Sequence, residues 1–146
     1  MKKKKREKIG NMLKAVAKEL PHLNYCQGMN QIAAFLLDVC GDDEEEAFFV
    51  FLCLMIDSDY SNLFKNELEK LNLLFYQFER IVSNTLSEIY FYLKNNNITP
   101  GYFVSPWFIT IFTDAFIDKA EENNKKIIMK IFDLFILSGW KAIIKI

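Results

Sequence analysis

The segment Tyr25-Cys26-Gln27-Gly28-Met29-Asn30 places residues that could support catalysis in a turn before an apolar helix. The side chain of Gln27 has a carbonyl that can accept a hydrogen bond from a water and an amide that can donate one to an anionic oxygen. Gly28 would let the backbone approach a partner closely, because it has no side chain. Tyr25 could anchor the turn or offer its hydroxyl, and Asn30 could cap the following helix. The alternative is that all four residues serve only the geometry of the turn and the cap.

Other polar residues form weaker patterns for chemistry. His22 and Cys26 are four residues apart, but no second ligand pair at zinc spacing accompanies them, so a surface histidine and a core cysteine are expected. The segment 57–62 begins like a calcium loop, but Asn62 replaces the required glycine and Leu68 stands where the bidentate glutamate would be. A polar loop that ends a helix is the favoured interpretation. The single histidine of the chain argues against most catalytic triads.

The composition is that of a folded domain with an uneven distribution of charge. Hydrophobic residues make up 51% of the 146 residues and charged residues 25%, which argues against disorder. Residues 1–8 carry six basic groups and one acidic group. Because the whole chain has a net charge of −1, the remaining residues are acidic overall. This balance argues against a uniformly nucleic-acid-binding surface. It predicts a disordered basic terminus over 1–8, with binding of acidic lipid or a nuclear signal as the alternatives.

The cysteines and the apolar runs favour a cytoplasmic chain without a membrane span. The three cysteines form no Cys-x-x-Cys pair and no signal peptide follows the basic start, so reduced thiols are expected. The longest uninterrupted apolar run, 47–56, is about half as long as a membrane span and predicts a buried helix.

Apolar periodicity predicts an all-α fold, since no strand alternation persists anywhere in the sequence. The turn over 21–27 separates a helix over 9–20, which Pro21 stops, from a buried helix over 30–40, which Gly41 ends. The other predicted helices span 44–57, 64–84, 86–93, 105–112, 123–137 and an unfinished stretch from 140.

Particular residues should bound these helices. Asp42 or Asp43 should cap the helix with the acidic first turn, which the helix dipole favours. Ser105 should cap the helix over 105–112, which begins with a Ser-Pro pair. Gly139 should end the helix over 123–137. Along 64–84 the apolar residues recur at alternating steps of four and three, which predicts a seam that packs within the molecule.

The signature at 25–30 resembles the Tyr-x-Gln-Gly-Met-Asn motif of TBC domains, the GTPase-activating domains that act on Rab proteins. Further landmarks follow in the family's order. They are the helix around 13–17, the acidic start at 42–49, the stretch 107–112 that resembles Trp-Phe-x-Thr-x-Phe, Lys130-Ile131-Phe132-Asp133 in place of Arg-Ile-Trp-Asp, and Gly139. One short match alone is weak. The ordered set over 9–146 makes this chain similar to the later portion of a TBC domain, truncated at both ends.

The resemblance implies a role for each signature residue. Gln27 would be the catalytic glutamine that enters the GTPase site and orients the attacking water, while Tyr25, Gly28 and Asn30 would contact the partner. That partner would be a Rab-like small GTPase, which would itself carry the GTP and Mg²⁺. The chain would then have no cofactor of its own, and it would act as a cytoplasmic activator in vesicle trafficking, at membranes only through the GTPase.

The family's second catalytic residue, an arginine in an Ile-x-x-Asp-x-x-Arg motif, has no counterpart in this chain. Of its two arginines, Arg6 lies in the lysine run and Arg80 lies far along the chain on an amphipathic helix. Such an arginine contributes about 10³–10⁵ in rate, or roughly 4–7 kcal/mol of barrier. We therefore expect the chain alone to be a weak activator at best. The alternative function is a non-catalytic helical module or scaffold that binds a GTPase or a partner helix.

The truncation that the resemblance implies leads to a prediction about association. Helices that lack their usual neighbours should leave apolar faces uncovered, and large exposed apolar patches drive association. We expect the chain to form dimers or aggregates in sedimentation velocity at micromolar concentrations. A well-behaved monomer across that range would contradict the prediction.

Overall fold

The computed structural model describes residues 2–58, 60–65, 68–116 and 122–144, and every regular element within these ranges is a helix. The all-α prediction is therefore confirmed for the described part of the chain. None of the described helices combines the length and the apolar character needed to cross a bilayer.

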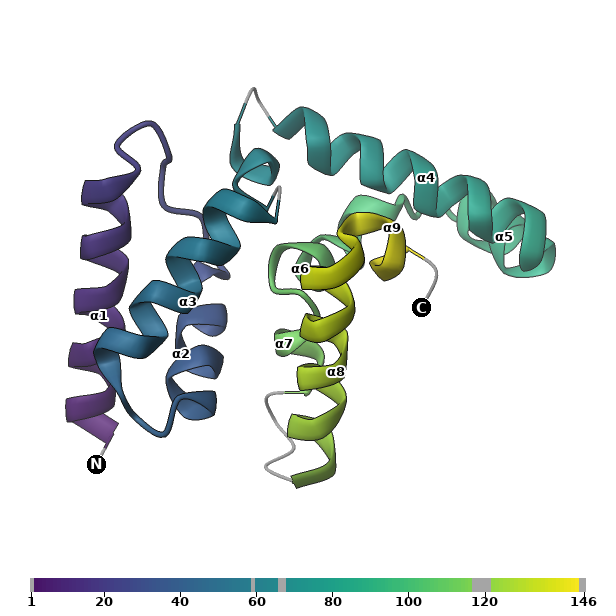
Figure 1. Cartoon of the computed structure of the whole chain (residues 1–146). Helices are drawn as coiled ribbons and strands as arrows, with labels where there is room; N and C mark the ends of the chain where they lie inside the picture. Colours follow the sequence, from purple (N-terminus) through teal and green to yellow (C-terminus); the bar gives the residue numbers. More distant parts are fainter. Residues whose placement is uncertain (1, 59, 66–67, 117–121, 145–146) are drawn as a thin grey trace.

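Figure 1 shows two groups of helices and a projecting hairpin. Helices α1 (Lys2–Glu19), α2 (Met29–Val39) and α3 (Glu44–Asp57) pack against one another on the left. The hairpin of α4 (Glu69–Thr85) and α5 (Ser87–Asn95) extends to the right. The second group consists of α6 (Ser105–Ile109), α7 (Thr113–Phe116), α8 (Glu122–Ser138) and α9 (Trp140–Ile143). The described residues also form the short 3₁₀ helices η1 (Tyr60–Phe64) and η3 (Pro100–Tyr102).

One apolar core joins the two groups. The ring of Phe35 on α2 lies 4.9 Å from that of Phe132 on α8, centroid to centroid. Tyr60, which is fully buried in η1, stacks on Trp140 of α9 at 6.4 Å. Such aromatic pairs contribute about 0.5–1.5 kcal/mol each beyond the area that they bury. The first group is therefore held against the second by side chains far apart in the sequence.

Asp43 caps α3, as the sequence predicts for one of two aspartates. Its carboxylate accepts hydrogen bonds from the backbone N–H groups of Glu45 and Glu46, both at 3.0 Å. The chain reverses just before this cap, where Gly41 has a φ of 62°. The left-handed backbone conformation causes little strain in glycine, which is why glycine commonly follows the end of a helix. The predicted boundaries of α3 follow from these local signals.

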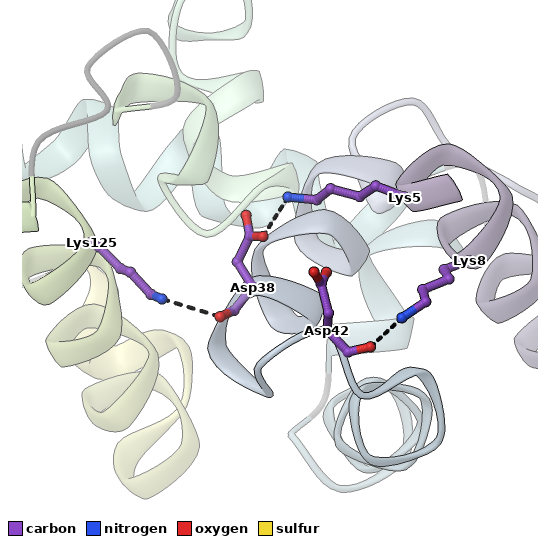
Figure 2. Close-up of polar contacts among 5 residues, drawn as sticks. All are labelled: Lys5, Lys8, Asp38, Asp42 and Lys125. Carbon is purple, nitrogen blue, oxygen red and sulfur yellow. Dashed lines mark hydrogen bonds and ion pairs between the residues drawn. The ribbon is translucent and has the colours of Figure 1, made fainter. Parts of the chain in front are cut away.

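The lysine run at 2–8 belongs to α1, which differs from the disordered terminus that the sequence predicts. Figure 2 shows the reason, because lysines converge on the C-terminal end of α2. Lys5 pairs with the carboxylate of Asp38, and Lys8 donates to the backbone carbonyl of Asp42. From α8, Lys125 donates to the backbone carbonyl of Asp38 at 3.1 Å. Cations are favoured at this end of a helix by its dipole, so these contacts stabilise the first turns of α1.

Three predictions about local structure are wrong, each because tertiary packing overrides a local pattern. The segment expected as a polar loop at 57–62 contains η1, in which Tyr60 and Ser61 are buried. Ser105 does not cap α6, because Val104 is the N-cap and the Ser105 hydroxyl donates to the Gly101 carbonyl at 2.6 Å. The helix expected to continue through residue 112 ends at Ile109, since Ile111 and Phe112 have positive φ angles.

The helix α3 is buried on one face only, although its apolar run over 47–56 predicts a buried helix. Phe49 and Ile56 are 53% and 57% exposed, while Phe51 and Met55 are fully buried. The apolar helix α8 behaves in the same way, with Leu137 81% exposed. Exposed apolar faces of this kind would drive the self-association that the sequence predicts, which stays a prediction.

Candidate functional site

The signature lies on a connection between α1 and α2 that is anchored by apolar side chains. Leu23 and Met29 are buried at either end of it, and between them Tyr25 and Gln27 are exposed. The backbone N–H of Cys26 points to the Met29 sulfur at 3.5 Å, and the N–H of Met29 donates to the Cys26 carbonyl at 3.2 Å. The turn that presents Gln27 is thus closed by its own neighbours.

Asn30 fastens this turn on both sides of Gln27. Its side-chain carbonyl accepts one hydrogen bond from the Tyr25 hydroxyl and a second from the backbone N–H of Gly28, each at 3.2 Å. The prediction that Asn30 caps α2 is wrong, because Gly28 is the N-cap and Asn30 is the second residue of the helix. Asn30 instead holds the residues that precede the helix, which restricts the backbone on either side of Gln27.

Gly28 occupies a position that only glycine fits well. Its φ is 114°, in the region that L side chains rarely adopt. A Cβ at this position would lie 2.6 Å from Cγ2 of Ile109 and 3.2 Å from Cγ2 of Thr110. The backbone of the turn therefore lies directly on the end of α6. The close approach of Gly28 to a partner, which the sequence suggests, stays a prediction.

The end of α6 is itself held in place from η1. The hydroxyl of Tyr60 donates to the backbone carbonyl of Ile109, next to the contact with Gly28. Burial raises the pKa of the Tyr60 hydroxyl well above its usual range, so this donor keeps its proton at physiological pH. Because Tyr60 is also stacked in the core, the surface under Gly28 is part of the rigid interior.

A further polar contact ties α2 to α7. The side-chain amide of Gln31 donates to the carboxylate of Asp114 at 2.6 Å, and the Asp114 N–H donates to the Thr110 hydroxyl at 3.2 Å. Neither Gln31 nor Asp114 stands out as a candidate site residue from the sequence alone. Gln31 lies in the first turn of α2, four residues after Gln27, and this closeness to the signature is the one local signal that could have drawn attention to it.

Gln27 is the signature residue whose side chain faces solvent without internal restraint. Its amide makes no hydrogen bond to any described residue. Among the described residues, Arg6 on α1 and Arg80 on α4 are exposed, and neither forms a hydrogen bond or an ion pair with the turn. The structure therefore brings Tyr25, Gly28 and Asn30 together around an outward-facing Gln27 and adds no arginine to them.

The neighbouring cysteine and histidine do not form a second chemical centre. Burial raises the pKa of the Cys26 thiol, so the neutral thiol dominates at neutral pH and a nucleophilic thiolate is disfavoured. His22 is exposed, as expected. No group of three metal-ligating side chains occurs among the residues that the structure describes.

The turn and the helical fold agree with what comparison with known proteins shows. Residues 1–146 match the family described as the Rab-GTPase-TBC domain, and the chain belongs to this family. The predicted resemblance of the chain to TBC domains is thereby confirmed.

Three relatives illustrate the extent of the similarity. The chain is 29% identical over 136 residues to TBC1 domain family member 4 of Mus musculus, covering 93% of this chain and 10% of the relative. It is 32% identical over 140 residues to Ecotropic viral integration site 5 protein homolog of Homo sapiens, covering 96% and 16%. It is 28% identical over 141 residues to GTPase-activating protein GYP5 of Saccharomyces cerevisiae, covering 97% and 15%. The chain thus spans 10% to 16% of the length of these relatives.

The free side chain of Gln27 leads to a prediction about stability. Replacement of an exposed residue that makes no contact changes the unfolding free energy by about ±0.5 kcal/mol at most. We expect Gln27→Ala to leave the melting temperature nearly unchanged. Gln31→Ala, which removes the hydrogen bond to Asp114, should lower the unfolding free energy by about 1 kcal/mol. A large loss for Gln27→Ala in thermal unfolding would show that Gln27 is a structural residue.

Gly28 leads to the opposite prediction. Gly28→Ala should lower the unfolding free energy by about 2–4 kcal/mol, because left-handed backbone strain adds to overlap with Ile109. Gly41→Ala is the matched control, since Gly41 also has a positive φ but has open space around its Cβ position. Urea unfolding should show a clearly larger loss at Gly28 than at Gly41. Equal losses would mean that the contact with α6 adds nothing.

Proposed function

We propose that this chain supplies a catalytic glutamine, Gln27, to a Rab-like GTPase that carries GTP and Mg²⁺. The observation that carries the proposal is the exposed, unbonded amide of Gln27 on a turn held from both sides. Membership of the Rab-GTPase-TBC family supports it. So does the name of the relative GTPase-activating protein GYP5.

The geometry suits the task of orienting a water. The Gln27 carbonyl would accept a hydrogen bond from the attacking water, and its amide would donate to an oxygen of the transferred phosphoryl group. Catalysis of this kind depends on position, and small displacements of a catalytic group are costly. The bonds from Tyr25 and Gly28 to Asn30, and the seat of Gly28 on α6, limit such displacements.

The turn offers no cation to stabilise the charge that develops on the phosphate oxygens. Gln27 alone leaves that part of the barrier, roughly 4–7 kcal/mol, unmet. We propose that an arginine from outside residues 1–146 completes the site in the working protein. The relatives are several times longer than the part matched here, so they have room for such a residue.

A second candidate function is a non-catalytic module that binds a GTPase or a partner helix. The lack of any arginine at the turn favours it, as do the exposed apolar faces of α3 and α8. The two functions agree on the partner and differ on whether Gln27 acts in hydrolysis. As either an activator or a scaffold, the chain would act at the cytoplasmic face of membranes that carry the GTPase, in vesicle trafficking.

The decisive experiment measures single-turnover phosphate release from a panel of GTP-loaded Rab proteins. The chain alone should accelerate hydrolysis little, because charge stabilisation is missing. A longer protein that adds a segment with an Ile-x-x-Asp-x-x-Arg motif should raise the rate by orders of magnitude. In that protein Gln27→Ala should lower the rate about 10²-fold or more while GTPase binding persists.

Gln77→Ala is the matched control for this measurement. Gln77 is also an exposed glutamine, but it lies on α4, and its replacement should leave the rate unchanged. Strong activation by the chain alone would show that the GTPase or another residue supplies the missing charge. If the longer protein with Gln27→Ala binds the GTPase and stimulates GTP hydrolysis at the parent rate, Gln27 takes no part in hydrolysis. The second candidate, a non-catalytic binding module, is then the correct function of this chain.

A further inference from the structure

The helix α1 carries a charge opposite to that of the rest of the chain. Its residues, Lys2–Glu19, include eight basic and two acidic side chains, about +6. Since the whole chain has a net charge of −1, the remainder is about −7. In Figure 1, α1 forms the outer edge of its group, with α2 and α3 on its inner side. The positive charge is therefore concentrated at one side of the molecule.

Helical spacing places part of this charge on one outward face of α1. Lys3 and Lys14 are eleven positions apart, or about three helical turns. Arg6 follows Lys3 by three positions and Lys18 follows Lys14 by four, so all four side chains lie on one side of the helix. The opposite face of α1 buries Met12 and Val16 in the core. We define the cationic face as the four exposed side chains Lys3, Arg6, Lys14 and Lys18.

The cations of this face are available, unlike two other lysines of α1. Lys5 and Lys8 turn inward to Asp38 and to the Asp42 carbonyl, as Figure 2 shows. Members of the cationic face make no hydrogen bond or ion pair with a described residue. Along the helix axis the face extends about 22 Å, at a rise of about 1.5 Å per residue.

Acidic groups lie near this face but do not neutralise it. Glu7 lies among its residues in the helical register, and Glu19 lies at the end of α1. From α3, Glu44 and Glu45 line a shallow hollow on another flank of α1, beside Asn11 and Ala15. Four cations against one carboxylate leave the face with a net charge of about +3.

We propose that the cationic face of α1 docks the protein on an anionic lipid bilayer. A flat, lengthwise row of lysines with one arginine fits the diffuse negative charge of such a surface, which attracts each nearby cation independently. A nucleic acid fits less well, because α1 contains no aromatic side chain on which bases could stack. The apolar side of α1 is held in the core, so binding is electrostatic and inserts no apolar side chains into the bilayer. Because the face points away from α2, the turn with Gln27 stays open to a partner.

The test is co-sedimentation of the chain with phosphatidylcholine vesicles that contain or lack phosphatidylserine. We expect binding only to the anionic vesicles and release at about 1 M salt, where the Debye length falls to about 3 Å. The triple variant Lys3→Gln, Lys14→Gln, Lys18→Gln should bind about a hundredfold more weakly, because each cation near the surface contributes about fivefold in affinity. The salt response of the unmodified chain tests the proposal independently of how the variant folds.

The matched control removes the same charge elsewhere. The variant Lys94→Gln, Lys130→Gln, Lys141→Gln changes exposed lysines of α5, α8 and α9, and it should bind anionic vesicles within a few-fold of the parent chain. Equal losses in the two triple variants would overturn the proposal, because net charge alone would then explain binding. Equal binding to neutral vesicles would also overturn it and would point to the exposed apolar faces. Tighter binding to duplex RNA or DNA than to the vesicles at the same salt would assign the face to nucleic acid instead.

Discussion

The close contact between the backbone of Gly28 and the end of α6 determines where the functional turn lies and which elements must be in place to hold it. Without a Cβ at Gly28, the turn can rest on Ile109 and Thr110. The carbonyl of Ile109 is in turn bonded by the buried hydroxyl of Tyr60. The position of Gln27 therefore depends on residues that lie 33 to 83 positions further along the chain, from Tyr60 to Thr110. A local hexapeptide carries the proposed catalytic side chain, but the core determines where the backbone of that hexapeptide lies.

Some of this fold could be predicted from the sequence because the signals are local. The limits of α3 follow from a capping aspartate, an acidic first turn and the end of an apolar run, and all three signals lie within residues 43–57. In contrast, the end of α6 at Ile109 has no local signal. Ile111 takes a left-handed φ of 47° and is fully buried, so packing in the core outweighs the backbone preference of a β-branched residue. Tyr60 shows the same effect, since polar neighbours suggested a loop while ring stacking with Trp140 buries it.

The candidate site divides in the same way. The residue types and order of Tyr25, Gln27, Gly28 and Asn30 indicated a functional turn, and the structure places them together. What Asn30 does was not predictable, because its carbonyl can serve a cap or a preceding turn equally well and only the path of the chain before α2 decides between them. The bond between Gln31 and Asp114 was out of reach for another reason. The two residues are 83 positions apart, and no pattern in a single sequence pairs a half-buried glutamine with a distant aspartate.

The proposed chemistry separates two physical tasks that a GTPase activator has to perform. Orientation of a water requires a side chain whose backbone does not move, and this chain meets that requirement through packing beneath Gly28 and the double hydrogen bond to Asn30. Stabilisation of developing charge requires a cation within a few ångström of the phosphate, and no residue of the turn meets it. The first task depends on the core and cannot be moved to another segment without the fold. The second depends on one long side chain, which any adjoining segment can supply if it reaches the site. A division of the two tasks between segments is therefore physically reasonable, and it is consistent with a well-formed glutamine turn that has no arginine beside it.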